Sequence, residues 1–368
     1  MIVIGVDTHK RSHTLVALDA ATGQARGQLT IAATDEGTLL ALRFAVELDA
    51  ERVWAVEDCR HVSGRLERGL LASGDRVLRV APGLTETSRR AVREAGKSDP
   101  IDATAIARAA LREGLDTLPV AHLDEQALEI RTLNDYRDQI VCERSRLACR
   151  LRWQLVQLAP DLEAKLAPAS LDHPQVRERV ARRLARLPGT AQVRVAKLTL
   201  KRIGQITVEE RELRAEITAL IEAHCPALLA EHGCGPVTAA IIIGHTAGAE
   251  RFPTDACFAR HAGTAPIPAS SGNTQRHRLH RGGNRQLNRA IHIIALSRAR
   301  TDPATRAYLD RKHAEGKSKR EAIRCLKRHV ARRIWRVLYT TTPLPDERPV
   351  NPNGTVKGDA PALMPCTR

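Results

Sequence analysis

The chain has 368 residues, and its 58 Lys and Arg against 42 Asp and Glu give a formal net charge of +16 and an isoelectric point near 10.1. Such a balance favours a polyanionic partner, either nucleic acid or an anionic membrane surface. No stretch approaches the roughly 18 apolar residues of a membrane span, and no basic region precedes the apolar start as in a signal peptide. The composition therefore predicts a cytoplasmic protein with no membrane partner.

The cysteine and aromatic residues exclude further classes of protein and of nucleic-acid recognition. The eight cysteines are scattered without a C-x-x-C pair, which argues against a zinc ribbon and against a disulfide scaffold. Aromatic residues make up only 2 % of the chain, which argues against recognition of bases mainly by stacking. Binding of nucleic acid would then rely on phosphates and on shape.

The first part of the chain, residues 1–118, alternates strand and helix patterns. Residues 2–7 form an apolar run that ends on Asp7, which is typical of a strand buried on both faces. A helix begins near Asp35, which we expect to cap it, and Pro82 with Gly83 closes the last strand. The sequence predicts a small α/β domain with a mixed sheet. Its expected strands are 2–7, 14–19, 28–32, 52–57 and 76–81, and its expected helices are 35–47, 63–73 and 99–112.

The rest of the chain is predominantly helical. Residues 119–230 hold two long amphipathic patterns, about 122–158 and 175–224, which predict a helical coiled-coil arm used for oligomerisation. Residues 231–340 form a basic, mainly α-helical unit, and a proline-rich segment, 341–368, is typical of a disordered tail. The basic unit opens with Gly233 and Gly235, which resemble the hairpin of a helix-hairpin-helix motif that presents backbone N–H groups to a phosphate. An ordinary helix–helix turn explains the same glycines equally well.

Four carboxylates stand where rigid elements would end or begin. Asp7 and Glu57 end predicted strands, and Asp99 and Asp102, three apart, share one face at a helix start. Taken singly they are explained as strand ends and helix caps. Together they offer hard oxygen ligands that suit Mg²⁺ or Mn²⁺, and two such ions can stabilise both oxygens of a phosphodiester displacement. Asp58 is the alternative ligand to Glu57. Neighbours in a strand point to opposite faces, so only one of the two can face the metal site.

A polar turn between helical segments is the second candidate site. Ser270, Ser271 and Gly272 precede a run of arginines, and no acidic residue occurs from Ser271 through Arg300. A plain turn is one explanation; a serine that attacks a phosphate beside guanidinium groups is the other. A basic helix follows, with apolar positions at helical spacing. The candidate nucleic-acid contacts are Arg276, Arg278, Arg281, Arg285, Arg289, Lys317, Lys319, Arg320, Arg324, Lys327 and Arg328.

Several of these motifs, in this order, resemble the insertion-sequence transposases of the IS-one-ten type, to which pilin-gene invertases of the Piv kind are related. The matching pieces cover most of the chain to about residue 340. They are GVDTHK, VEDCRHVSGRLERGLL, GKSDPIDATAIARAAL, DYRDQIVCERSRL, GTAPIPASSGN, HRGGNRQLNRAIH and GKSKREAIRCLKRH. Many relatives have Glu-x-Thr-Gly where this chain has residues 57–60.

The resemblance implies a RuvC-like, RNase H-like N-terminal domain with a D-E-D-D tetrad at Asp7, Glu57, Asp99 and Asp102. It further implies a nucleophilic Ser271, with Ser270 as the alternative, and Mg²⁺-assisted transfer through a serine–DNA bond. It implies as partners donor and target DNA, a structured guide RNA and further copies of the chain in a dimer or tetramer, in a bacterial, nucleoid-associated setting.

Two other functions remain open from the sequence. One is a RuvC-like endonuclease or junction resolvase, in which the tetrad cleaves DNA with water and Ser271 belongs to a turn. The other is a non-catalytic basic nucleic-acid-binding protein, in which the acids are only caps and strand ends.

Overall fold

The structure is a computed structural model that describes residues 1–57, 60–90, 98–122, 124–269, 277–280 and 282–341. Two compact units are present. The first comprises Met1–Asp124, Ala230–Gly233 and His245–Arg368, and the second comprises Glu125–Leu229 and Cys234–Gly244. Within the described residues no helix is both long enough and apolar enough to cross a membrane.

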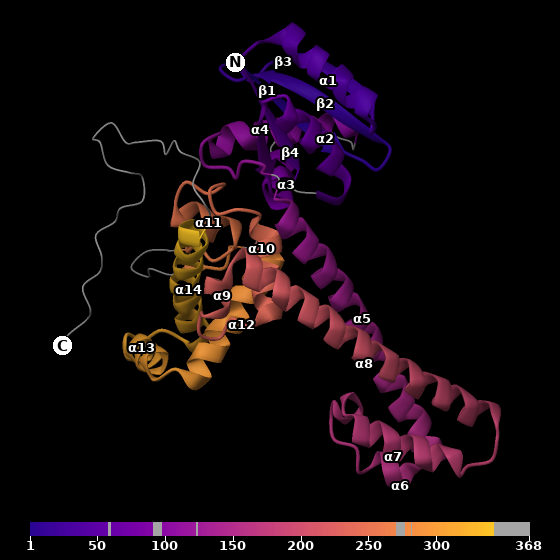
Figure 1. Cartoon of the computed structure of the whole chain (residues 1–368). Coiled ribbons are helices and arrows are strands. Elements are labelled where there is room, and N and C mark those ends of the chain that lie inside the picture. The colour runs from indigo at the N-terminus through magenta and orange to yellow at the C-terminus, as the bar shows by residue number, and fades with distance from the viewer. Residues whose placement is uncertain (58–59, 91–97, 123, 270–276, 281, 342–368) are drawn as a thin grey trace. The chain divides into compact units, whose positions relative to one another are not determined.

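A five-stranded mixed sheet forms the N-terminal part of the first unit (Figure 1). The strand order is β3-β2-β1-β4-β5, in which β1 is antiparallel to β2 and parallel to β4, and β4 is parallel to β5. This mixed α/β sheet was predicted, and its order is consistent with the expected RNase H-like domain. The strands are β1 (Ile2–Thr8), β2 (Ser12–Asp19), β3 (Ala25–Ala32), β4 (Arg52–Glu57) and β5 (Arg76–Val80).

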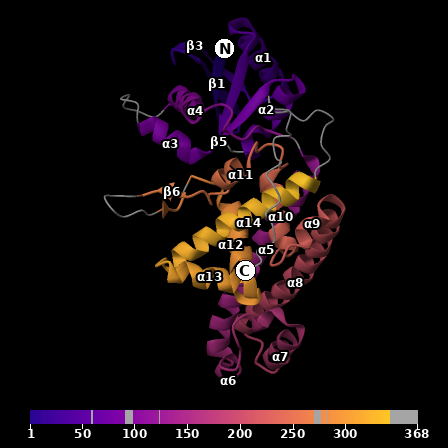
Figure 2. The same cartoon turned by 90° about the vertical axis from the view of Figure 1, so that its left-hand side faces the viewer.

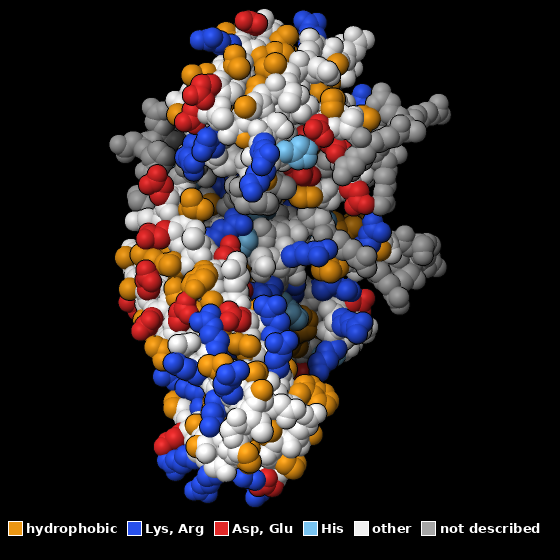
Figure 3. Space-filling view, turned by 90° about the vertical axis from the view of Figure 1, so that its right-hand side faces the viewer, with side chains coloured by type: hydrophobic (Ala, Val, Ile, Leu, Met, Phe, Trp, Pro, Cys, Tyr) orange, Lys and Arg blue, Asp and Glu red, His pale blue; other side chains and the backbone are white. Residues whose placement is uncertain are grey.

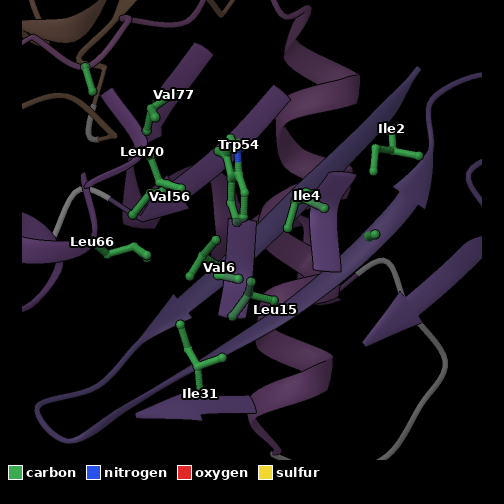
Figure 4. Packing of buried hydrophobic residues seen from close by; sticks show 14 residues of the cluster. Ile2, Ile4, Val6, Leu15, Ile31, Trp54, Val56, Leu66, Leu70 and Val77 are labelled. Atoms are coloured by element: carbon green, nitrogen blue, oxygen red, sulfur yellow. The ribbon is translucent and has the colours of Figure 1, made fainter. Parts of the chain in front are cut away.

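The sheet is covered on both faces because alternate residues of a strand point to opposite sides. Ile4 and Val6 of β1 pack with Trp54 of β4 in the cluster that also holds residues of α1 and α2 (Figure 4). Val3 of the same strand instead joins the cluster that includes Ala103 and other residues of α4. The central strands β1 and β4 are therefore apolar almost throughout, as expected for a strand buried on both faces. The covering helices are α1 (Asp35–Leu48), α2 (Arg60–Ala72), α3 (Pro82–Arg90) and α4 (Asp99–Glu113).

One local prediction for this domain was wrong. The N-cap of α1 is Thr34, whose hydroxyl accepts a hydrogen bond from the Gly37 N–H at 3.2 Å, and Asp35 is instead the first helical residue. The last strand does end before Pro82, as predicted, and Pro82 and Gly83 open helix α3. A proline in the first turn of a helix loses no hydrogen bond, since its N–H would have had no partner there.

Two long helices, α5 (Glu125–Leu158) and α8 (Ala191–His224), dominate the second unit. They are joined by buried or half-buried ion pairs, Arg137 to Glu210 at 2.8 Å and Arg202 to Glu143 at 2.9 Å. Shorter elements pack against their ends and share an apolar cluster with them. The predicted pair of long helices is confirmed, whereas coiled-coil packing stays a prediction. The remaining elements of this unit are α6 (Pro160–Glu163), the 3₁₀ helix η1 (Ser170–Asp172), α7 (Pro174–Ala185), α9 (Pro226–Leu229) and most of α10 (Pro236–Thr246).

In the C-terminal part of the first unit, the described elements are helices and one short hairpin (Figure 2). Its two strands pair antiparallel, Ile267 with Arg278 and Pro268 with His277, where the sequence had predicted only a turn between helices. Its last helix begins after Ser318, whose N–H donates to the Glu321 carboxylate at 2.9 Å in a capping box. The elements are α11 (Asp255–His261), β6 (Ile267–Pro268), β7 (His277–Arg278), α12 (Arg285–Thr301), α13 (Pro303–Ala314) and α14 (Lys319–Thr341).

Many charged side chains lie at the surface, although several, among them Glu67, Arg79 and Lys327, are buried. On the face drawn in Figure 3, Lys and Arg side chains are numerous and Asp and Glu side chains are interspersed among them. The predicted amphipathic basic helix is confirmed as α14, in which Leu326, Val330, Ile334 and Leu338 are buried. The predicted disordered tail lies almost wholly outside the described residues.

Candidate functional site

The carboxyl ends of β1 and β4 place two of the predicted acids side by side. The two strands are parallel, and their register pairs Val6 with Val56, so Asp7 and Glu57 are the next residues on adjacent strands. Because residues two apart share a face, Asp7 lies on the same face as Val3, which packs with α4. Asp7 is 7 % exposed, and Glu57 is half-buried at the end of β4.

A glycine allows α4 to approach this edge of the sheet. A Cβ added to Gly5 would lie 2.0 Å from the Ala103 carbonyl oxygen and 2.9 Å from the Ala107 Cβ, so the backbone of β1 touches the backbone of α4. Gly5 and Asp7 are two residues apart and face the same way. The close contact therefore brings the first turn of α4 to the Asp7 carboxylate.

The first turn of α4 carries the other two acids. Ser98 occupies the N-cap position with an extended backbone, and Asp99 and Pro100 are the first helical residues. The prediction that Asp99 itself is the N-cap was therefore wrong. Asp99 is exposed and Asp102 is 7 % exposed. Both carboxylates lie at the helix N-terminus, where the helix dipole favours negative charge.

His9 is a member of this cluster that the sequence reasoning missed. Its Nε2 lies 3.4 Å from Asp7 Oδ2 and 3.3 Å from Asp99 Oδ1. One atom each of Asp7, His9 and Asp99 lie within 4.8 Å of one another, close enough to hold one ion. The signal was present in the motif Asp7-Thr8-His9, since the second residue after a strand-end carboxylate returns to the same face.

The electrostatics of Asp7 show a concentration of negative charge. Burial raises the pKa of the Asp7 carboxyl, and the nearby charges of Asp102, Asp99 and Glu57 raise it further, while His9 lowers it. The four predicted acids are thus close enough to interact, although they come from three separate elements. Among the described residues, the buried Oδ2 of Asp7 has no hydrogen-bond partner.

This arrangement fits a divalent metal ion. Hard carboxylate oxygens on rigid elements are the ligands that Mg²⁺ and Mn²⁺ prefer, and a cation would be a partner for the buried Oδ2 of Asp7, which accepts no hydrogen bond among the described residues. Asp7, Asp99 and, with them, Glu57 and Asp102 are the residues that would hold it. The geometry does not separate Glu57 from Asp58, because Asp58 lies outside the described residues.

Of the predicted C-terminal cations that the structure describes, five are exposed and three are half-buried. Ser270, Ser271, Gly272, Arg276 and Arg281 lie outside the described residues. Gly233 adopts a φ of +83°, and a Cβ there would lie 3.1 Å from the Ser297 side chain, so close packing on α12 accounts for this glycine. Its predicted phosphate role, and that of Gly235, stays a prediction. The exposed or half-buried cations are Arg278, Arg285, Arg289, Lys317, Lys319, Arg320, Arg324 and Arg328; Lys327 alone is buried.

A mixed sheet that gathers carboxylates at one edge, in a chain this basic, is consistent with an enzyme that processes nucleic acid. Comparison with known families makes the assignment specific. Residues 4–160 match the model of the DEDD transposase domain of IS110, and residues 225–310 match that of the transposase IS116/IS110/IS902 family. The chain belongs to the IS110/IS116 family of insertion-sequence transposases, as the motifs had indicated.

Individual relatives agree with this assignment. The chain is 34 % identical over 273 residues to the insertion element IS110 43.6 kDa protein of Streptomyces coelicolor, covering 62 % of this chain and 67 % of that protein. It is 28 % identical over 384 residues to the insertion element IS900 42 kDa protein of Mycobacterium paratuberculosis, covering 91 % of this chain and 94 % of that protein. A probable family 20 transposase of Pseudomonas aeruginosa is 27 % identical to this chain over 192 residues, covering 49 % of this chain and 52 % of that protein.

Proposed function

We propose that this transposase cuts and exchanges DNA strands with a divalent-metal site formed by Asp7, Glu57, Asp99 and Asp102, and with Ser271 as the attacking group. The observation that carries the proposal is the convergence of these four acids at one edge of the sheet, on the face covered by α4. Caps and strand ends would not need to meet. The convergence therefore argues against a purely structural role for the acids.

Each part of the site has a distinct task in this proposal. The main chains of β1, β4 and α4 fix the carboxylates, so that little reorganisation is needed when DNA binds. One or two bound Mg²⁺ or Mn²⁺ ions would supply charge stabilisation at the scissile phosphate. His9, between Asp7 and Asp99, would orient these two carboxylates through its Nε2.

In the proposed reaction, Ser271 Oγ forms a bond to the DNA phosphorus while one phosphorus–oxygen bond of the strand breaks. The serine proton leaves to a base, and the departing DNA oxygen takes up a proton. The phosphodiester energy is kept in the serine–DNA bond, so a second strand can later displace the serine. Sequence similarity to the family motif SSGN supports Ser271, and Ser270 is the alternative one residue away.

The proposal extends to partners. A net charge of +16 and the many exposed cations suit both donor and target DNA and a structured guide RNA encoded by the element. A homo-oligomer, a dimer to tetramer that uses the α5–α8 pair, would bring together the two or more sites that strand exchange requires.

A trapping experiment tests the mechanism. Full-length protein, Mg²⁺, RNA from the element flanks and labelled DNA are incubated, and the products are separated by denaturing electrophoresis. A protein–DNA adduct that Ser271→Ala and Asp7→Asn abolish, and Ser270→Ala retains, is the expected result. Nicked DNA without adduct in any lane, undiminished in Ser271→Ala, would instead identify a nuclease of the junction-resolvase kind.

A further inference from the structure

A cavity of about 530 Å³ lies within the C-terminal part of the first unit, between the β6–β7 hairpin and helices α13 and α14. It is of the size that holds small organic ligands or nucleotides, about 300–1,000 Å³. Six cationic side chains and two carboxylates line it. The cations are Arg278, Lys312, Lys317, Arg324, Lys327 and Arg328, and the carboxylates are Glu315 and Glu321.

Most of these charges already have partners at the rim. Glu315 lies 2.8 Å from the Lys312 amine and 3.8 Å from the Lys317 amine. Glu321 is engaged by the Ser318 N–H and hydroxyl at 2.9 and 2.6 Å. Arg328 pairs with Asp255 at 3.1 Å. The carboxylates thus neutralise the rim, and the inner part of the cavity keeps a positive charge.

Among the described residues, Lys327 is a buried cation of this cavity with no carboxylate paired to it. Its side chain is buried, only 6 % of the residue being exposed. Its amine donates to the side-chain oxygen of Asn288, and among the described residues no carboxylate lies within ion-pair distance of it. Residues 270–276, between the two hairpin strands in the sequence, include no acidic residue.

The amine is held in this place by a defined network. Asn288 uses its amide N–H groups on the carbonyls of Ala262 and Gly263, both at 2.9 Å, and its oxygen is therefore turned toward Lys327. Gly263 itself lines the cavity. A buried amine is costly unless an anion compensates it, yet the chain builds a network that keeps Lys327 at the cavity wall rather than letting it extend to solvent.

We propose that this cavity binds a phosphodiester group of the nucleic acid, with Lys327 as its inner cation and Arg324 at its rim. Arg324 Nη2 reaches the carbonyl of His277 in β7 at 3.4 Å, so it stands between α14 and the hairpin. The group would come from a DNA strand or from an RNA strand, which share this chemistry. The inference rests on the proposed function in that nucleic acid is the substrate, but it needs no strand cleavage.

Binding measurements on the full-length protein test the proposal. Fluorescence anisotropy is recorded with a labelled single-stranded DNA and with an RNA of the same sequence, without divalent ions, at several salt concentrations. Lys327→Met is expected to weaken at least one of the two by about tenfold or more, because a charge-assisted hydrogen bond to phosphate is lost, and to lower the salt slope by about one. The more affected strand identifies the source of the phosphate.

The matched control is Lys201→Met, which removes the same charge from an exposed position of α8 in the other unit. We expect it to weaken binding less than about twofold. Equal losses in the two variants, or no loss in Lys327→Met, would overturn the assignment of Lys327.

A second measurement uses the wild-type protein and does not depend on the folding of any variant. Acetylation of lysines is followed by mass spectrometry in sodium chloride, in inorganic phosphate at equal ionic strength, and with each oligonucleotide. The oligonucleotides are expected to slow the labelling of Lys327 at least fivefold more than that of Lys201. Equal labelling rates of Lys327 with and without oligonucleotide would refute the binding of a phosphodiester group in this cavity. Absence of the serine–DNA adduct, with Lys327 still protected by the oligonucleotides, would refute only the proposed function.

Discussion

The chain carries two clusters of like charge, and they are built by opposite means. At the edge of the N-terminal sheet, four short acidic side chains come from β1, β4 and α4, whose main chains fix them. In the C-terminal cavity, a long side chain, Lys327, is bent inward from one helix and held by Asn288. One atom each of Asp7, His9 and Asp99 lie close enough together to hold one ion, whereas the Lys327 amine donates to an uncharged amide oxygen.

The difference shows how charge and rigidity are matched to the ligand. A compact divalent ion tolerates little misplacement of its ligands, so short side chains on strands and a helix start are suitable. A phosphodiester on a mobile strand is larger, and a flexible four-carbon stem can follow it. The comparison predicts that the acidic site is damaged by any change in backbone position, and the basic cavity mainly by loss of charge.

The largest expected effect comes from Asp7→Asn. Removing a partner outside the ligand shell of a metal costs about 10- to 100-fold in activity or affinity, so loss of a ligand should lower strand cleavage by more than about 100-fold. Without metal, the same change should raise the melting temperature, because the buried charge repels Asp102, Asp99 and Glu57. Asp116→Asn, at a nearly fully exposed side chain, is the control. A lower melting temperature, or unchanged cleavage, would show that Asp7 is a structural residue.

Gly5→Ala tests the claim that backbone contact builds the acidic site. The new Cβ would lie 2.0 Å from the Ala103 carbonyl oxygen, so α4 must move away from β1, and we expect a loss of about 3 kcal/mol in the free energy of unfolding. Gly64→Ala in α2, where a Cβ meets nothing within 4 Å, should instead stabilise the protein by up to about 1 kcal/mol. Chemical denaturation measures both changes. Similar changes in the free energy of unfolding for the two variants would contradict the claim that the close β1–α4 contact builds the acidic site.

Divalent ions should stabilise the acidic site selectively. At about 100 times its dissociation constant, a ligand of the folded state adds about 2.7 kcal/mol, so Mg²⁺ or Mn²⁺ should raise the melting temperature of the wild type. Asp7→Asn should lose most of this shift, whereas Lys327→Met should keep it. Differential scanning calorimetry against matched concentrations of sodium chloride makes the comparison. An equal shift in all three proteins would indicate only nonspecific ion binding.

The smallest effect concerns the titration of Lys327. Burial lowers the pKa of its amine from 10.5 to about 8. The charge of Lys327 acts on His292, and the other basic residues of the cavity are His277, Arg278, Lys312, Lys317, Arg324, Arg328 and His329. Between about pH 8 and 10.5 the unfolded chain binds more protons than the folded one. Stability should therefore rise with pH across this window, relative to Lys327→Met. Urea denaturation at intervals from pH 7.5 to about 10.5 measures it, and parallel profiles of the two proteins would refute the lowered pKa.

Local patterns in the sequence determined much of this protein. The apolar run before Asp7 predicted β1, the alternation of strands and helices predicted the mixed sheet, and helical spacing of apolar residues predicted α14. The resemblance of the motifs predicted the family. These signals are local because burial imposes a period of 2 on strands and 3.6 on helices, and because strand ends place carboxylates at a sheet edge.

The tertiary structure alone decided what depends on residues distant in the chain. It paired residues 267–268 with 277–278 as a hairpin. It also set His9 between two acids and turned Lys327 toward Asn288. None of these is written in a periodic pattern, because each depends on which side chain from another element comes within about 3–4 Å. The sequence therefore determined which residue types carry charge and on which elements, and packing decided which of them meet.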